Sequence, residues 1–297
     1  MEFESLNILL PLFLLIAGGY VISRVFTISE GPLVRVVTDF FMPLLVLHSF
    51  CTTTIPVDQI YRLIGVVTAL IFIFLLISWL YCKASNISFK GFAPPLLFMN
   101  SGFLGIPLMK VWGGLAAMNV IIIYDQIQTF YIFTLGIMIV TGSYRMTGLL
   151  EMARSPLIWA ILVGFWLNLT GVEVPSTILK TLQFGGEAAP ALAIFCIGMV
   201  LNRYKVSFNR HVWAGVFIRI VVGFLFGLLL VRVFGFTGMA STVIVIASAL
   251  PSAVFSVVLP IRYGVDGTYA GSILIISTVL SLVTLPILFY LSQSLAP

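Results

Sequence analysis

Residues Phe92–Gly114 read FAPPLLFMNSGFLGIPLMKVWGG, and this stretch decides the fold. Both of its ends are apolar enough to form a helix in lipid, but its middle holds polar, glycine and proline residues: Asn100, Ser101, Gly102, Gly105 and Pro107. Such residues expose backbone N–H and C=O groups, which lipid cannot satisfy. A break of this kind is tolerated only where the backbone lines a cavity or is buried in protein. The sequence therefore predicts a membrane helix that is broken in its middle.

A second interrupted segment lies farther along the chain. Val243–Tyr263 reads VIVIASALPSAVFSVVLPIRY, with Pro251 at its centre and Pro260 near its end. Two broken apolar segments at corresponding positions of two halves are the best sequence indication of a transporter binding site. The pair therefore predicts a transporter whose site lies at the two breaks.

The composition is that of an integral membrane protein. Of the 297 residues, 61% are hydrophobic and only 8% are charged, and the mean hydropathy is +1.18. Soluble domains carry roughly 25% charged residues. At about 20 residues per span, the chain has room for roughly ten helices and no sizeable soluble domain. The net charge of +5 comes from basic residues in short loops, where they set orientation, so it does not indicate a nucleic-acid partner.

The three cysteines and the N-terminus carry little functional information. Cys51, Cys82 and Cys196 are far apart and lie inside or beside apolar segments, so we interpret them as packing residues rather than as a disulfide or metal site. The first residues, MEFESLN, are acidic rather than basic, so we expect no cleavable signal peptide. No motif implies a cofactor.

Ten apolar runs predict ten transmembrane helices, at residues 5–25, 32–50, 59–82, 92–111, 115–141, 156–170, 176–201, 211–234, 239–262 and 268–291. Residues 1–141 and 156–297 each hold five of them, joined by a short cytoplasmic linker at 142–155. Because five is odd, the second half enters the membrane in the opposite sense, which makes the halves an inverted repeat. The pairs Pro43 with Pro190, and Gly102 with Pro251, support this alignment because their offsets are nearly equal. The predicted fold class is an all-α polytopic membrane protein.

The basic residues predict the orientation. With the N-terminus outside, ten Lys and Arg residues fall in inner loops and four at outer ends, while Arg219 lies inside a span and is left out. Cytoplasmic loops carry an excess of Lys and Arg. Both termini are therefore expected on the outer side of the membrane.

Asn100 is the first candidate for substrate binding. A polar group within the bilayer is expensive and indicates function by default. The amide of Asn100 offers two donors and one acceptor beside the free N–H groups and positive dipole end of the second half-helix, together with Ser101 and Gly102. This combination favours an anion such as a carboxylate. The alternative is that Asn100 caps the half-helix.

A polar run follows in the middle of the fifth predicted span, with Tyr124, Asp125, Gln126, Gln128 and Tyr131. Gln126 and Gln128 cannot point the same way on a helix, so at most one of them faces a cavity. Asp125 points in a third direction and could titrate or bind a cation. The alternative for Asp125 and Gln128 is hydrogen bonding between helices.

Further candidates lie near the two kink prolines. Asp39 precedes Pro43 and Glu187 precedes Pro190, so each is a carboxylate near a kink and a candidate H⁺ or Na⁺ site, although Asp39 could also reach the cytoplasmic surface. His48 could line the pocket or carry a proton, or it could be a hydrogen-bonded packing residue. The glycines predict close helix contact, as in the pair Gly223-x-x-x-Gly227: Gly18, Gly19, Gly185, Gly186, Gly198, Gly223 and Gly227.

Several of these motifs resemble the auxin efflux carrier family, which includes the plant PIN carriers. Asn100–Leu108 (NSGFLGIPL) looks like the crossover of its fourth helix, and Phe40–His48 (FFMPLLVLH) resembles its second helix. Gln126 and Tyr131 keep the Gln-x4-Tyr spacing of its fifth helix. Ala249–Pro251 (ALP) and Arg262–Val265 (RYGV) look like the ninth-helix crossover and its exit. The resemblance spans nearly the whole chain.

The resemblance implies a scaffold domain from helices 1, 2, 6 and 7, which also forms homodimer contacts. It implies a transport domain from helices 3–5 and 8–10 and elevator-type alternating access, in a fold similar to that of bile-acid and sodium/proton carriers. In the plant members the substrate carboxylate meets the crossover asparagine, which matches Asn100, with the fifth-helix residues matching Gln126 and Tyr131 nearby. The substrate-binding residues expected here are Asn100, Ser101, Gly102, Gln126, Tyr131, Pro251 and His48.

The chain departs from the plant carriers in lacking their long loop between helices 5 and 6 and in carrying an extra Asp125. The short-loop form resembles bacterial members, for which malate or malonate is the usual assignment and the inner membrane the location. We therefore expect a secondary transporter of small organic anions, such as malate, malonate or auxin-like acids. One alternative is a Na⁺- or H⁺-coupled carrier using Asp39, Asp125 or Glu187, and another is a sensor that binds without transporting. No His-Glu-x-x-His pair or Gly-x-Ser-x-Gly elbow is found, so an enzyme is not expected.

Overall fold

The computed structural model describes residues 2–26, 28–52, 56–142, 153–203 and 206–296. Throughout these ranges the regular structure is helical apart from one isolated β-bridge, between Met99 and Ser252. Six helices are long and apolar enough to cross a membrane: Glu30–Cys51, Asp58–Ser85, Ser101–Thr141, Ser176–Leu201, Arg210–Val233 and Thr268–Leu295. The protein is therefore an all-helical integral membrane protein, as the composition predicted.

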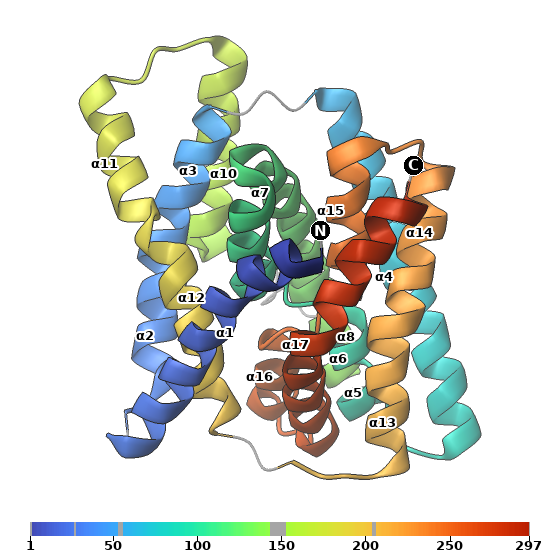
Figure 1. Ribbon diagram of the computed structural model, residues 1–297. Helices are drawn as coiled ribbons and strands as arrows, with labels where there is room; N and C mark the ends of the chain where they lie inside the picture. Colours follow the sequence, from blue (N-terminus) through green and yellow to red (C-terminus); the bar gives the residue numbers. More distant parts are fainter. Residues whose placement is uncertain (1, 27, 53–55, 143–152, 204–205, 297) are drawn as a thin grey trace.

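One group of helices lies on the left of Figure 1. It comprises α1 (Glu2–Val25), α2 (Glu30–Val36), the π-helical η1 (Val37–Phe41), α3 (Met42–Cys51), α10 (Pro156–Thr170), α11 (Ser176–Gly186) and α12 (Ala188–Leu201). Helix α1 packs on α12, while α3 packs on α10 and α11. The α1–α12 contact is very close, because Gly19 meets the carbonyl oxygen of Phe195 and Gly198 meets that of Ile16. The predicted packing role of these two glycines is confirmed.

The second group lies at the centre and right of Figure 1. Its long elements are α4 (Val57–Ser85), α13 (Arg210–Phe217), the π-helical η4 (Ile218–Val222), α14 (Gly223–Val233), α15 (Gly238–Ala249) and α17 (Thr268–Leu295). Helix α14 packs against α15, where both Gly223 and Gly227 lie against Ser248. This small-residue pair therefore packs helix on helix, as predicted.

A helical hairpin stands between the two groups. It is built from η2 (Ser101–Gly105), α7 (Ile106–Tyr131), η3 (Ile132–Gly136) and α8 (Ile137–Thr141). Together these elements form the stretch Ser101–Thr141, of 41 residues. As one straight helix it would be about 60 Å long, about twice the thickness of the hydrocarbon core. The backbone leaves helical geometry at Gly113 and Gly114, where Gly114 has φ 63° and ψ −153°.

Contacts across the hairpin confirm that the chain reverses at Gly113–Gly114. Gly102 lies against the carboxylate of Asp125, and Gly105 lies against Ile121. These pairs are symmetric about the two glycines, which is the pattern of two antiparallel helices. The predicted boundary between the spans 92–111 and 115–141 is therefore confirmed, and the hairpin returns Asp125 to the level of the first break.

Both predicted breaks are confirmed. The first apolar segment forms α5 (Phe89–Phe92) and α6 (Pro94–Leu97), becomes extended at Phe98, and resumes as a helix at Ser101. The second ends α15 at Ala249 and resumes as α16 (Phe255–Arg262). Another predicted span, 176–201, is divided at Glu187 between α11 and α12, just before Pro190, whose ring cannot donate a backbone hydrogen bond.

Candidate functional site

The site begins where the two broken helices cross. The extended segments at the breaks run antiparallel and pair through their backbones, with Met99 opposite Ser252. The Asn100 N–H donates to the carbonyl of Pro251 at 2.8 Å, and the Ala253 N–H donates to the carbonyl of Phe98 at 2.8 Å. Each break therefore satisfies part of the other's exposed backbone, as burial in an apolar interior requires.

Gln128 on α7 completes this pairing from the side. Its Oε1 accepts from the Met99 N–H at 3.0 Å, and its Nε2 donates to the Met99 carbonyl at 2.7 Å and to the Ser101 hydroxyl at 3.0 Å. The side-chain amide of Gln128 thus pairs with both backbone groups of Met99, as a neighbouring β-strand would. Gln128 is only 1% exposed, and its three hydrogen bonds fix the shape of the crossover.

Asp125 lies one helical turn from Gln128 and faces the start of the second half-helix. It is buried, and its Oδ1 accepts a hydrogen bond of 2.7 Å from the Ser101 hydroxyl. Its Oδ2 accepts from Gln126 Nε2 at 3.1 Å. Gly102 allows this approach, because a Cβ there would lie 3.1 Å from Oδ1. The hairpin therefore brings a carboxylate to the first turn of a half-helix.

A cavity of about 500 Å³ opens beside the crossover, at the boundary between the two groups of helices. One wall consists of Asn100, Gly102, Asp125 and Gln128, with the start of α16 beside them. The opposite wall comes from α2, η1 and the start of α10. Three arginines and a second carboxylate also line it: Arg35, Arg154, Arg262 and Asp39. Arg35 and Asp39 form a loose ion pair at 3.9 Å.

Asn100 lines this cavity and carries a buried hydrogen-bond donor. The residue is 2% exposed, and its Nδ2 has no hydrogen-bond partner among the described residues. A buried donor without a partner costs about 1–3 kcal/mol. The two resuming helices begin beside the cavity, at Ser101 and Phe255, so the positive ends of their dipoles lie there. Some of their first N–H groups already donate to backbone carbonyls, as Ser101 does to Met99 and Ser256 to Ala253. The arrangement can hold a small anionic group.

The cavity brings together only part of the predicted site. Asn100, Gly102, Asp125 and Asp39 line it, whereas Ser101 and Pro251 lie behind the lining and hold the crossover through hydrogen bonds.

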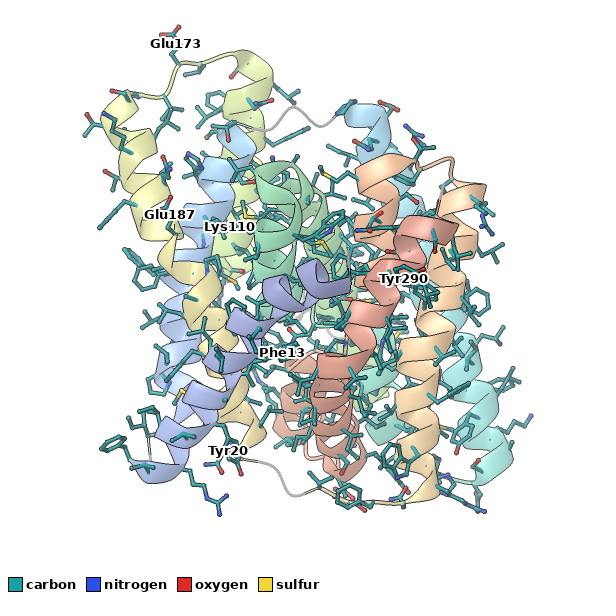
Figure 2. The ribbon with its side chains drawn as sticks, in the orientation of Figure 1. Phe13, Tyr20, Lys110, Glu173, Glu187 and Tyr290 are labelled. Atoms are coloured by element: carbon teal, nitrogen blue, oxygen red, sulfur yellow. The ribbon has the colours of Figure 1, made fainter. Side chains whose placement is uncertain are left out.

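The other candidates lie elsewhere. Gln126 lines a separate apolar cavity, and the Tyr131 hydroxyl lies 2.8 Å from that of Thr68 on α4. His48 and Glu187 are absent from the lining of the crossover cavity. Glu187 is exposed at the upper left of Figure 2, where it accepts a hydrogen bond of 3.1 Å from Gln183.

Two contributors were not singled out from the sequence. Ser252 donates from its hydroxyl to the Pro95 carbonyl at 2.6 Å, which ties the second break to the first half-helix. Arg219 is fully buried and donates to backbone carbonyls of both half-helices. A signal for Arg219 was present, because an arginine in the middle of an apolar span is rare and indicates function.

A polytopic helical protein whose two broken helices cross beside a polar cavity has the architecture of a membrane transporter. Comparison with known proteins agrees with this class. Residues 144–289 match the family model described as membrane transport protein. The chain therefore belongs to the family of membrane transport proteins, and the resemblance drawn from the sequence motifs is confirmed.

Relatives are known by sequence in archaea and bacteria. An uncharacterized transporter of Methanothermobacter thermautotrophicus is 31% identical over 205 residues, which is 66% of either chain. Another, of Methanocaldococcus jannaschii, is 29% identical over 63% of each chain. The uncharacterized transporter YfdV of Escherichia coli K12 is 25% identical over 50% of this chain and 48% of its own length. The matches thus span between about half and two thirds of each relative's length.

Proposed function

We propose that the protein is a secondary transporter that carries a small organic anion by elevator-type alternating access. The observation that carries the proposal is the unpartnered Nδ2 donor of Asn100, buried in the wall of a cavity beside two half-helix N-termini. Carboxylates are favoured at such termini because the N–H groups and the helix dipole point at them.

The charge of the lining supports an anionic substrate. Three guanidinium groups, of Arg35, Arg154 and Arg262, line the cavity with two carboxylates, of Asp39 and Asp125, which leaves an excess of one positive charge. Clefts with one sign of charge in excess and low-dielectric walls concentrate ligands of the opposite sign. The cavity of about 500 Å³ has room for malate, malonate or an auxin-like acid.

The helix arrangement supports the elevator mechanism. We assign α1–α3 and α10–α12 to a scaffold, and both broken helices, with α4, α7, α13, α14 and α17, to a transport domain. In this assignment the ten spans form two inverted repeats, residues 1–141 and 156–297, joined by 142–155, of which residues 143–152 lie outside the described part of the chain. The cavity lies where the two groups meet, which is where a moving domain would expose it to each side in turn. A homodimer joined through the scaffold belongs to the same proposal.

The proposed orientation places both termini outside a bacterial inner membrane. Arg35, Arg154 and Arg262 then all lie on the inner side, and all three line the cavity. The structure would therefore correspond to the state that is open to the cytoplasm.

Flux into proteoliposomes tests the proposal. A labelled panel of small mono- and dicarboxylates and an indole carboxylate is offered with and without pH, Na⁺ and voltage gradients. We expect saturable flux of one class that N100A abolishes, with at least an ~10-fold loss of affinity, because a hydrogen bond to a charged group is worth about 1.5–3 kcal/mol. N119A is the matched control, since Asn119 lies on the same hairpin but accepts from Ser49. Normal flux in N100A would contradict the assignment.

A second candidate is coupling of the anion to a proton at Asp125. This carboxylate lies in the same cavity wall as Asn100, and two negative charges in one poorly solvated cavity repel each other. Binding of the anion would be favoured when Asp125 holds a proton. Na⁺ coupling through Glu187 has less support, because that residue is exposed and lies outside the cavity lining.

A further inference from the structure

Arg219 is fully buried in the π-helical turn η4, between α13 and α14. Its Nε donates to the Leu250 carbonyl at 3.2 Å, and one terminal nitrogen donates to the Leu96 carbonyl at 2.5 Å. The other terminal nitrogen donates to the carbonyl of Ser248. Single π-helical turns inside α-helices are frequent at functional sites.

These three carbonyls belong to the C-terminal ends of the two half-helices that enter the crossover. Leu96 lies in the last turn of α6, while Ser248 and Leu250 lie at the end of α15. The last carbonyls of a helix have no partner within the helix and carry the negative end of its dipole. The guanidinium therefore neutralises two negative helix ends at once.

No carboxylate within ion-pair distance of Arg219 is found in the part of the chain that the structure describes. Its charge is balanced instead by these carbonyl oxygens and by the ring of Phe74, whose centroid lies 4.2 Å from the guanidinium carbon. Gly223, one turn further, leaves room for the group, because a Cβ there would lie 2.9 Å from Nη2. A buried cation is expensive unless it is paired in this way.

We infer that the Arg219 guanidinium acts as a built-in cation between the C-terminal ends of the two half-helices. Its carbonyl site is of the kind in which transporters with broken helices bind a coupling ion. In such transporters unwound carbonyls and half-helix C-termini coordinate Na⁺. Here the side chain fills that role permanently, so the crossover is held together without a dissociable ion. Removing the guanidinium leaves a site for a small monovalent cation.

The test needs no transport substrate, so its outcome is independent of the proposed function. Wild type, R219K, R219Q and R219A are purified in detergent, and amide hydrogen exchange is followed in peptides that contain residues 98–101 and 250–253. R232A is the matched control, because Arg232 also donates to a backbone carbonyl, that of Leu295 at 2.8 Å, but at an exposed position. Methylguanidinium is the added probe, with choline at equal concentration as the salt control.

We expect slow exchange in wild type and R232A, intermediate exchange in R219K, and fast exchange in R219Q and R219A. Methylguanidinium, and not choline, should slow exchange in R219A and raise its unfolding midpoint by about 3 °C at about ten times its Kd. Equal exchange in R219Q and R219K would overturn the inference, because the charge would then be dispensable. Failure of methylguanidinium to protect a folded R219A would overturn it too.

If R219A does not fold, the comparison of R219K with R219Q still tests whether a positive charge is required at this position. Recovery of folded R219K without folded R219Q supports a requirement for positive charge. Recovery of R219Q without R219K contradicts it.

Discussion

Gly102 and Asp125 are in contact across the helical hairpin, so closely that a Cβ on Gly102 would lie 3.1 Å from the Asp125 Oδ1. Both residues also line the cavity beside Asn100. The contact fixes the carboxylate against the first turn of the half-helix, and it depends on the absence of a side chain at Gly102. The geometry of the site can therefore be disturbed without removing any polar group.

The variant G102A is expected to displace the Asp125 carboxylate from the Ser101 hydroxyl and to weaken anion binding. Overpacking costs about 1–3 kcal/mol of folding stability. The part of this strain that is felt only in the anion-bound state lowers the affinity, by about tenfold for each 1.4 kcal/mol. Binding of the transported acid to purified protein measures this. G31A is the control, because Gly31 lines the same cavity and a Cβ there would meet no atom within 4 Å. Equal affinities for the two variants would contradict the prediction.

Two glutamines on the same helix should differ sharply when they are replaced by alanine. Q128A removes three hydrogen bonds and leaves the buried N–H of Met99 without a partner, whereas the Met99 carbonyl keeps the Ser101 N–H at 2.8 Å. The expected cost is about 1–3 kcal/mol of unfolding free energy. Q126A removes one bond to Asp125 and should cost under about 1 kcal/mol. Thermal unfolding in detergent compares them. A more severe effect of Q126A on stability would show that Gln128 does not hold the crossover.

The pH dependence of anion binding should depend on Asp125. If binding is favoured by the protonated carboxyl, affinity falls as the pH rises, by up to about tenfold per pH unit for one linked proton. D125N should bind with little dependence on pH, because it has lost the group that titrates in the cavity wall. Isothermal titration at several pH values measures the slope. E187Q is the control, since Glu187 is an exposed carboxylate outside the lining of the cavity.

The breaks, the hairpin and the position of Asn100 at the first break could be predicted from the sequence because each has a local cause. Polar residues and glycines within apolar runs mark a broken helix, and the Gly113–Gly114 pair separates two spans. The partners of Asp125 and Gln128 could not be predicted, because helix periodicity gives a direction for each side chain but not the neighbour it meets. Hydrogen bonding was one open interpretation for both, and the structure gives each a partner in the crossover.

Gln126 and Tyr131 also show that spacing along a helix does not determine which neighbours a side chain meets. Resemblance placed both side chains near the substrate, but in the structure neither lines the crossover cavity. Tyr131 is turned towards Thr68 on α4, and Gln126 reaches the cavity only through Asp125. A one-residue difference on a helix rotates a side chain by about 100°, so pocket membership depends on rotations that spacing alone does not fix.

The contact between α1 and α12 allows a prediction from two adjacent glycines. G19A would drive a methyl group into the backbone carbonyl of Phe195, and backbone cannot move aside as a flexible side chain can, so we expect a loss of about 1–3 kcal/mol or more. G18A meets only the ring of Phe195, at 3.9 Å, and replaces a helical glycine by alanine, so its stability should be unchanged or higher by about 0.5–1 kcal/mol. Thermal unfolding of the purified variants compares them. The two positions lie at the same depth in the lipid, so a loss of stability in G19A without a loss in G18A would identify the close helix contact as the cause. Equal losses of stability in the two variants would show that α1 and α12 do not pack this closely in the membrane.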